Sequence, residues 1–236
     1  MIVGLVVSAA MYGQQNFASL SFGASLPLGD YTATESLASS GYAKTGGTIK
    51  FDAGFFPANY FGIAGSFTLR SNYAIRESLL EDMIHHIENS GSAPASIPEE
   101  ANIILGTGFW SNVSLYIGPD FSIRASQRLY LDFRIVGGLT FVKPPEQELL
   151  IEYKGEHYHS FVSNNRVTLG WGGGVGIRYK INDALALRLA VDYSQARAKF
   201  EYNFDLFAGL IDDIPPVDAQ FQVRTLEPSI GLAYSF

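Results

Sequence analysis

Large apolar residues alternate with small or polar residues along most of this chain. The pattern is clearest in the last segment, where the even positions from Leu226 to Phe236 are apolar and the odd positions are Glu, Ser, Gly and Ala. A period of two is typical of a β-strand, because successive side chains point to opposite faces. Seven further segments share the pattern: Ala18–Leu28, Ile49–Pro57, Phe61–Arg70, Phe109–Phe121, Leu129–Phe141, Val167–Lys180 and Leu185–Ser194.

The connections between these segments alternate in length. Short turns follow Pro57, Ile123 and Lys180, and long segments lie at Tyr31–Thr45, Asn72–Asn102, Lys143–Asn165 and Asn203–Ala219. Outer-membrane barrels have short periplasmic turns and long extracellular loops, and an even strand number places both termini on one side. The sequence therefore predicts an all-β fold, a closed antiparallel up-and-down transmembrane β-barrel of about eight strands.

Alternation alone does not say which face is wet, because a soluble lipocalin-type barrel also alternates, with its apolar residues inside. The outer face of a soluble barrel would be rich in Lys, Glu and Thr. Here the second face is mostly Gly, Ala and Ser with scattered Arg and Asp. Aromatic residues also fall near segment ends, where membrane barrels carry interfacial girdles: Phe121, Tyr179, Tyr193, Tyr234 and Phe236. We therefore expect the apolar face to contact lipid.

Composition narrows the function classes. Charged residues make up 17% of the 236 residues, and the net charge of −7 leaves no basic stripe for nucleic acid. The absence of cysteine excludes disulfides and thiolate metal sites and fits passage through an oxidising periplasm. No run reaches the ~18 apolar residues of a helical span, so any membrane crossing must use strands.

The N-terminal run Met1–Gly13 is apolar and uncharged, with small residues at Ser8 and Ala10 that suit a cleavage site. A leader also begins with Lys or Arg, which this run lacks. We expect residues 1–14 to be a signal peptide truncated at its start, and 15–236 to be the barrel domain. A disordered or strand-like N-terminus is the alternative.

The terminal pattern Ile230-x-Leu232-x-Tyr234-x-Phe236 resembles the C-terminal signature of bacterial outer-membrane barrels. Leu26–Tyr31 also looks like the corresponding segment of the OmpA-like "outer membrane protein beta-barrel domain" family. The resemblance covers nearly the whole chain and implies a fold and a location, the bacterial outer membrane, rather than an activity. It also implies contact with outer-membrane lipid and recognition of the terminal strand by the barrel-assembly machinery.

The interior of a barrel of about eight strands is just filled by side chains, so a wide pore is not expected. The small-residue face carries charges of both signs, as a buried ion-pair network requires. The predicted lumen network contains Lys50, Asp52, Arg70, Asp132, Arg134, Arg178, Lys180, Arg188, Asp192 and Glu227. A satisfied polar plug is the favoured interpretation, and a narrow path selective for small anions is the alternative.

The histidines do not indicate an enzyme. All four, His85, His86, His157 and His159, fall in predicted loops. Outer-membrane hydrolases and acyltransferases place a His with a Ser or acidic partner at the rim or lipid boundary, so we expect no catalytic residue. His157 and His159 would share a strand face, and Asp82 and His86 a helix face, but solvated loop histidines are commoner. No metal or cofactor is predicted, and a rim-type hydrolase stays a third possibility.

Two loop segments have structure of their own. Ile75–Glu88 has apolar residues at helical spacing, which predicts a short amphipathic helix. The apolar side of this helix is expected to fold onto the barrel mouth or other loops, and a partner-binding surface is the alternative. Leu149–Val162 resembles a projecting hairpin whose edge could pair with a partner strand. We therefore predict a barrel with a plugged lumen that serves surface recognition, adhesion or envelope integrity through its loops, which bind an extracellular protein or surface ligand. A narrow channel or carrier for small solutes is the alternative.

Overall fold

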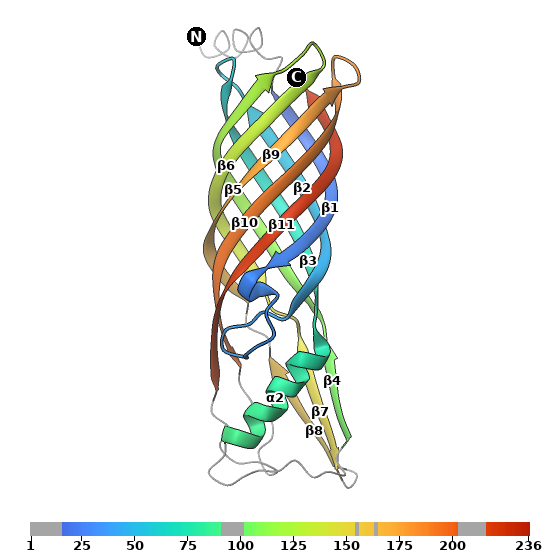
Figure 1. Ribbon diagram of the computed structural model, residues 1–236, viewed down its shortest axis with the longest axis vertical. Coiled ribbons are helices and arrows are strands. Elements are labelled where there is room, and N and C mark those ends of the chain that lie inside the picture. Colours follow the sequence, from blue (N-terminus) through green and yellow to red (C-terminus); the bar gives the residue numbers. More distant parts are fainter. Residues whose placement is uncertain (1–15, 91–101, 154–155, 163–164, 203–215) are drawn as a thin grey trace, which may run out of the picture.

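The computed structural model describes residues 16–90, 102–153, 156–162, 165–202 and 216–236. Eight strands form a closed antiparallel barrel in the order β1-β11-β10-β9-β6-β5-β3-β2 (Figure 1). They are β1 (Phe17–Leu28), β2 (Ala43–Phe55), β3 (Phe61–Ala74), β5 (Phe109–Arg124), β6 (Leu129–Lys143), β9 (Arg166–Lys180), β10 (Leu185–Tyr202) and β11 (Val217–Ser235). The predicted eight-stranded, up-and-down barrel is confirmed. The predicted signal peptide at 1–14 lies outside the described residues.

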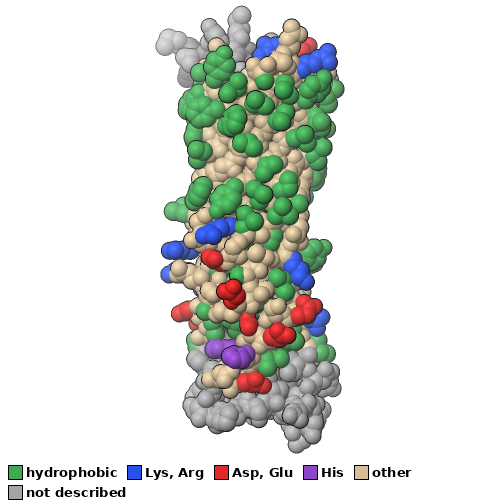
Figure 2. Space-filling view, viewed as in Figure 1, with side chains coloured by type: hydrophobic (Ala, Val, Ile, Leu, Met, Phe, Trp, Pro, Cys, Tyr) green, Lys and Arg blue, Asp and Glu red, His purple; other side chains and the backbone are tan. Residues whose placement is uncertain are grey.

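The side chains alternate across the barrel wall, and the apolar ones point outward. In β10, Leu187 and Leu189 are exposed, whereas Arg188 and Asp192 are buried. Figure 2 shows hydrophobic side chains spread over the wall for most of its height. This arrangement is the inverse of a soluble barrel, and an apolar band of this kind is what membrane-spanning strands present to lipid.

Glycine on the inward face makes room for large polar side chains from neighbouring strands. A Cβ atom at Gly174 would lie 1.8 Å from the Asp192 carboxylate, and one at Gly170 would lie 2.2 Å from the Tyr116 hydroxyl. Such distances are far below van der Waals contact, so any larger residue would displace these groups. The glycine-rich strand β9 therefore shapes the lumen as much as the charged strands do.

The aromatic residues predicted at the membrane boundaries lie on the outward face. Phe121, Tyr179, Tyr234 and Phe236 are exposed near the end of the barrel that holds the short turns. Tyr193 is partly buried because its ring packs 5.6 Å from that of Trp171, measured between centroids. Two aromatic zones at different heights agree with the girdles of a membrane barrel.

The two ends of the barrel differ (Figure 1). At the turn end, β1 begins beside the end of β11, with Phe17 opposite Ser235. The loop end carries the long connections. They include the 3-10 turn η2 (Gly29–Tyr31), the helix α2 (Arg76–Ser90) and a separate sheet of β4 (Asn102–Thr107), β7 (Gln147–Tyr153) and β8 (Glu156–Val162), in the order β4-β7-β8.

The loop end contains the differences between prediction and structure. The helix expected at 75–88 and the hairpin expected at 149–162 are present as α2 and β7–β8. Strand β4 was not predicted, because its six residues do not alternate. Strands β2, β3 and β11 each extend three residues into the predicted loops at 31–45, 72–102 and 203–219. None of the described helices is long and apolar enough to cross a membrane.

Candidate functional site

Nine of the ten charges predicted in the lumen are buried inside the barrel, each at most 7% exposed: Lys50, Asp52, Arg70, Asp132, Arg134, Arg178, Arg188, Asp192 and Glu227. Lys180 is the exception. It ends β9 at the barrel rim, is half-buried, and joins none of the ion pairs found in the described part of the chain. Its Nζ instead lies 5.3 Å from the centroid of the Tyr130 ring. Lys180 has the even numbering of the inward residues of β9, but it is the last residue of the strand and therefore lies beyond the network.

Arg134 connects the central part of this network across the lumen. Its guanidinium binds Asp52 of β2 at 2.7 Å and Asp192 of β10 at 2.8 Å. Arg188 is a second partner of Asp52, and Lys50 Nζ is a second partner of Asp192, at 2.5 Å. Each carboxylate therefore has two cationic partners. The ion pairs link β2, β6 and β10, no two of which are adjacent in the barrel.

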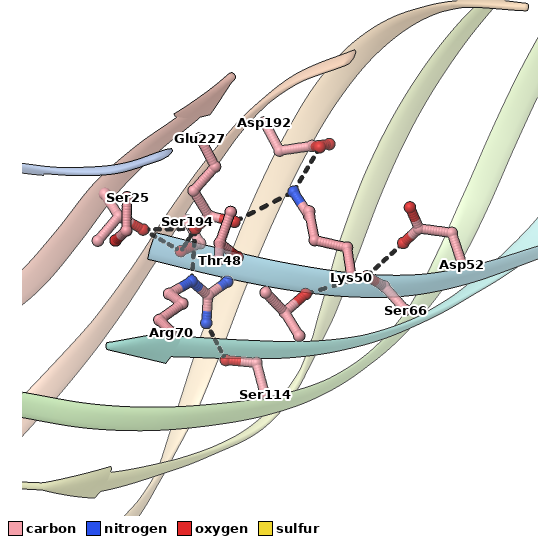
Figure 3. Close-up of polar contacts among 12 residues, drawn as sticks. Ser25, Thr48, Lys50, Asp52, Ser66, Arg70, Ser114, Asp192, Ser194 and Glu227 are labelled. Carbon is pink, nitrogen blue, oxygen red and sulfur yellow. Dashed lines mark hydrogen bonds and ion pairs between the residues drawn. The ribbon is translucent and has the colours of Figure 1, made fainter. Parts of the chain in front are cut away.

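The network continues toward the loop end through Glu227 (Figure 3). Glu227 forms ion pairs with Lys50, at 3.1 Å, and with Arg70. The hydroxyls of Ser194 and Thr225 also donate to Glu227, at 3.1 and 2.6 Å. Buried charges are tolerated when they are paired and hydrogen-bonded. Oε1 of Glu227 receives the hydrogen bonds, and Oε2 has the ion pair to Lys50.

A second group of charges lies nearer the turn end. Arg178 Nε donates to Asp132 at 2.7 Å, and the same guanidinium donates to Ser122 at 2.9 Å. Asp120 is also buried and inward-facing, with one carboxylate oxygen that has no hydrogen-bond partner among the described residues. The prediction omitted Asp120, although its parity is that of its inward neighbours on β5.

An aromatic cluster closes the loop end of the lumen. Trp110 is 1% exposed, and its ring packs edge-on against Tyr31, Phe200 and Phe221, with centroids 5.5 to 5.6 Å apart. Its Nε1 donates to the carbonyl of Gly41 at 2.8 Å. This cluster was not predicted from the sequence. The available signal was large aromatic residues at inward positions, where the other inward residues are small.

Helix α2 covers this aromatic closure. Leu79 and Met83 are each 1% exposed and belong to the same buried cluster as Trp110. The hydroxyl of Tyr42 donates to Asp82 of the helix. Burial, together with the neighbouring carboxylate, raises the pKa of Tyr42 well above its usual value, so the hydroxyl stays protonated as a donor. The apolar stripe of the helix therefore lies on the barrel mouth, as predicted.

A smaller closure lies at the turn end. Phe17 and Phe56 stack with centroids 6.3 Å apart and form a buried cluster with Ala186 and Ala233. The guanidinium of Arg178 lies 3.9 Å from the centroid of the Phe17 ring. The lumen is thus apolar at both ends and charged between them.

The remaining predicted residues lie elsewhere. Ile230, Leu232, Tyr234 and Phe236 are exposed on the outward face at the end of the chain, and their recognition by the assembly machinery stays a prediction. His85 and His86 lie on α2. His157 and His159 lie on β8, and the side chains of these two residues are outside the described set. No group of three or more potential metal ligands occurs in the described part of the chain.

No protein-family model and no curated protein matches the chain. Among solved structures, the outer membrane protein OprG from Pseudomonas aeruginosa aligns with a TM-score of 0.54 at 10% identity, over 94% of this chain and 95% of that one. AlkL has a TM-score of 0.46 at 14% identity, over 95% and 92%. Ail of Yersinia pestis has a TM-score of 0.41 at 16% identity, over 94% and 99%. The likeness to OprG shows that this chain has the fold of an outer-membrane β-barrel.

Proposed function

We propose that this chain is an integral barrel of the bacterial outer membrane whose lumen is closed by its own side chains. It acts through the structure that projects beyond the membrane at its loop end, in surface recognition, adhesion or envelope integrity. Its partner is an extracellular protein or surface ligand. No catalytic step is part of the proposal.

The aromatic closure around Trp110 is the observation that carries the proposal. A solute entering from the loop end would meet this cluster first, then the network centred on Arg134, then Phe17 and Phe56. A channel needs a continuous polar route through its constriction. Two apolar closures on either side of a buried ion-pair network therefore favour a plugged barrel over a narrow channel.

The shape of the loop end supports a recognition role. Helix α2 and the β4-β7-β8 sheet project beyond the barrel, and the helix is fixed to the barrel mouth by its apolar side (Figure 1). The opposite side of the helix exposes Glu77, Glu81 and Glu88. A rigid surface with carboxylates on its open side suits a partner that presents basic groups.

The orientation is testable by cysteine labelling, because the natural chain has no cysteine. We expect Glu81→Cys on α2 to react with a membrane-impermeant maleimide on intact cells. Gln127→Cys, an exposed position in a turn-end connection, should react only after the cells are lysed. Heat-modifiable mobility on SDS gels checks that both variants fold.

The labelling experiment has clear contrary results. Equal labelling of both positions on intact cells would mean that the loop end is not selectively outside. Labelling of Gln127→Cys alone would reverse the orientation. If neither position reacted until the outer membrane was permeabilised, the chain would not be a surface protein and the proposed role would fail.

A further inference from the structure

Strands β9 and β10 stop pairing before either strand ends. Their ladder reaches only Gly170–Ala196 toward the loop end, although β9 starts at Arg166 and β10 continues to Tyr202. On their other sides, β9 stays paired with β6 and β10 with β11 over these residues. A groove of about 500 Å³ lies in the barrel wall between the two strands.

The groove carries three exposed cations that form no ion pair with the described residues. Arg166, Arg197 and Lys199 line it, and none forms an ion pair within the described part of the chain. Among the described residues, their side chains make one hydrogen bond, from Arg166 Nε to the backbone carbonyl of Lys199, at 3.2 Å. Glu201 and Asp218 also line the groove, opposite each other and farther along β10 and β11 toward the loop end. The membrane side of the groove is therefore the cationic side.

The height of the groove matches the edge of the apolar band. Arg197 lies four residues beyond the girdle residue Tyr193 on the outward face of β10, a distance of roughly 13 Å along a strand. On β9 beside it, Leu169 and Val167 are 76% and 59% exposed. Figure 2 shows basic side chains immediately beyond the hydrophobic band toward the loop end. Cationic and apolar surfaces thus adjoin at the level of lipid headgroups.

We propose that this groove binds a phosphate-bearing lipid of the outer leaflet. Arg197, Lys199 and Arg166 hold the phosphate, because guanidinium and ammonium groups are the usual protein donors to phosphate. The acyl chains lie along Val167 and Leu169, which a soluble anion would leave uncovered. The inference goes beyond the proposed function. Lipid binding itself requires only that the barrel be inserted in a membrane or micelle, which heat-modifiable mobility measures separately, whereas the assignment to the outer leaflet rests on the proposed orientation, which the cysteine labelling tests.

Fluorescence quenching in micelles of the full chain tests this site. Phosphatidic acid with brominated acyl chains should quench Trp171, which lies on the same strand as Leu169, whereas the chain's second tryptophan, Trp110, is buried in the lumen. Brominated phosphatidylcholine should require a higher mole fraction. We expect R197Q/K199Q to weaken the phosphatidic acid response by roughly 30-fold, the size expected for the loss of two cations near an anionic lipid surface. R124Q/R128Q makes the same charge change at the turn end and should have no effect.

Three results would overturn the proposal. Equal quenching by the two lipids would exclude a headgroup preference, and an equal loss in both double variants would reduce the effect to net charge. Displacement of brominated phosphatidic acid by millimolar inorganic phosphate would identify a site for soluble anions instead of a lipid. If R197Q/K199Q does not fold, the single variants R197Q and K199Q provide the same comparison.

Discussion

Replacing Arg134 with Met is expected to lower the free energy of unfolding by about 3 kcal/mol or more, the range measured when one partner of a buried ion pair is removed. Arg134 holds Asp52 and Asp192 at 2.7 and 2.8 Å, and both carboxylates are buried. Without the guanidinium each retains one cationic partner, Arg188 or Lys50. Each buried carboxylate therefore loses its charge-assisted hydrogen bonds to Arg134.

Urea unfolding in phospholipid vesicles, followed by the heat-modifiable gel band, measures this loss. R124M is the matched control, because Arg124 is exposed at the turn end and, among the described residues, its side chain bonds to the carbonyls of its own turn. We expect the control to change stability by no more than ~0.5 kcal/mol. A double variant R134M/D192N should recover part of the loss. Equal midpoints for R134M and R124M would show that the network does not hold the barrel together.

Replacing Trp110 with Ala is expected to cost about 3–5 kcal/mol, the usual penalty for truncating a buried Trp. The change removes three aromatic contacts and the hydrogen bond to Gly41. It also removes support for α2, whose residues Leu79 and Met83 belong to the same cluster. We expect α2 to become accessible to protease in W110A while the barrel itself stays folded.

The matched control for this prediction is W171A. Trp171 is 52% exposed on the outward face, so lipid or detergent can fill the space that its side chain leaves. The same unfolding measurement should therefore show a smaller loss for W171A, with no change in protease cleavage of α2. A loss as large for W171A as for W110A would contradict a stabilising role specific to the closure.

The barrel was predictable because its chemistry repeats. Each strand carries the same two-residue pattern, so errors at single positions such as Lys180 do not change the assignment. The closures were not predictable in the same way. Trp110, Phe200 and Phe221 come from three different strands, and their contact depends on the register that brings them to one height. Parity assigns a side chain to the lumen but does not give its height in the lumen.

The sequence pattern also does not predict which lumen charges pair with each other. Parity placed Arg134 and Asp192 in the lumen, yet they are 58 residues apart in sequence and their strands are not adjacent in the barrel. Strand β4 and the groove between β9 and β10 depend on where ladders begin and end, which turn and loop geometry decides. The alternation of apolar and polar residues does not predict where a ladder begins or ends.

Single-channel recording across planar bilayers tests the closed lumen most directly. The protein is purified, shown to be heat-modifiable, and inserted at increasing amounts in concentrated salt. A barrel closed by the Trp110 cluster and the Arg134 network should give no discrete conductance steps, and W110A should give none either, because the charged network stays in place. Reproducible steps from the natural chain, with a preference for small anions, would contradict the plugged lumen and identify a narrow channel.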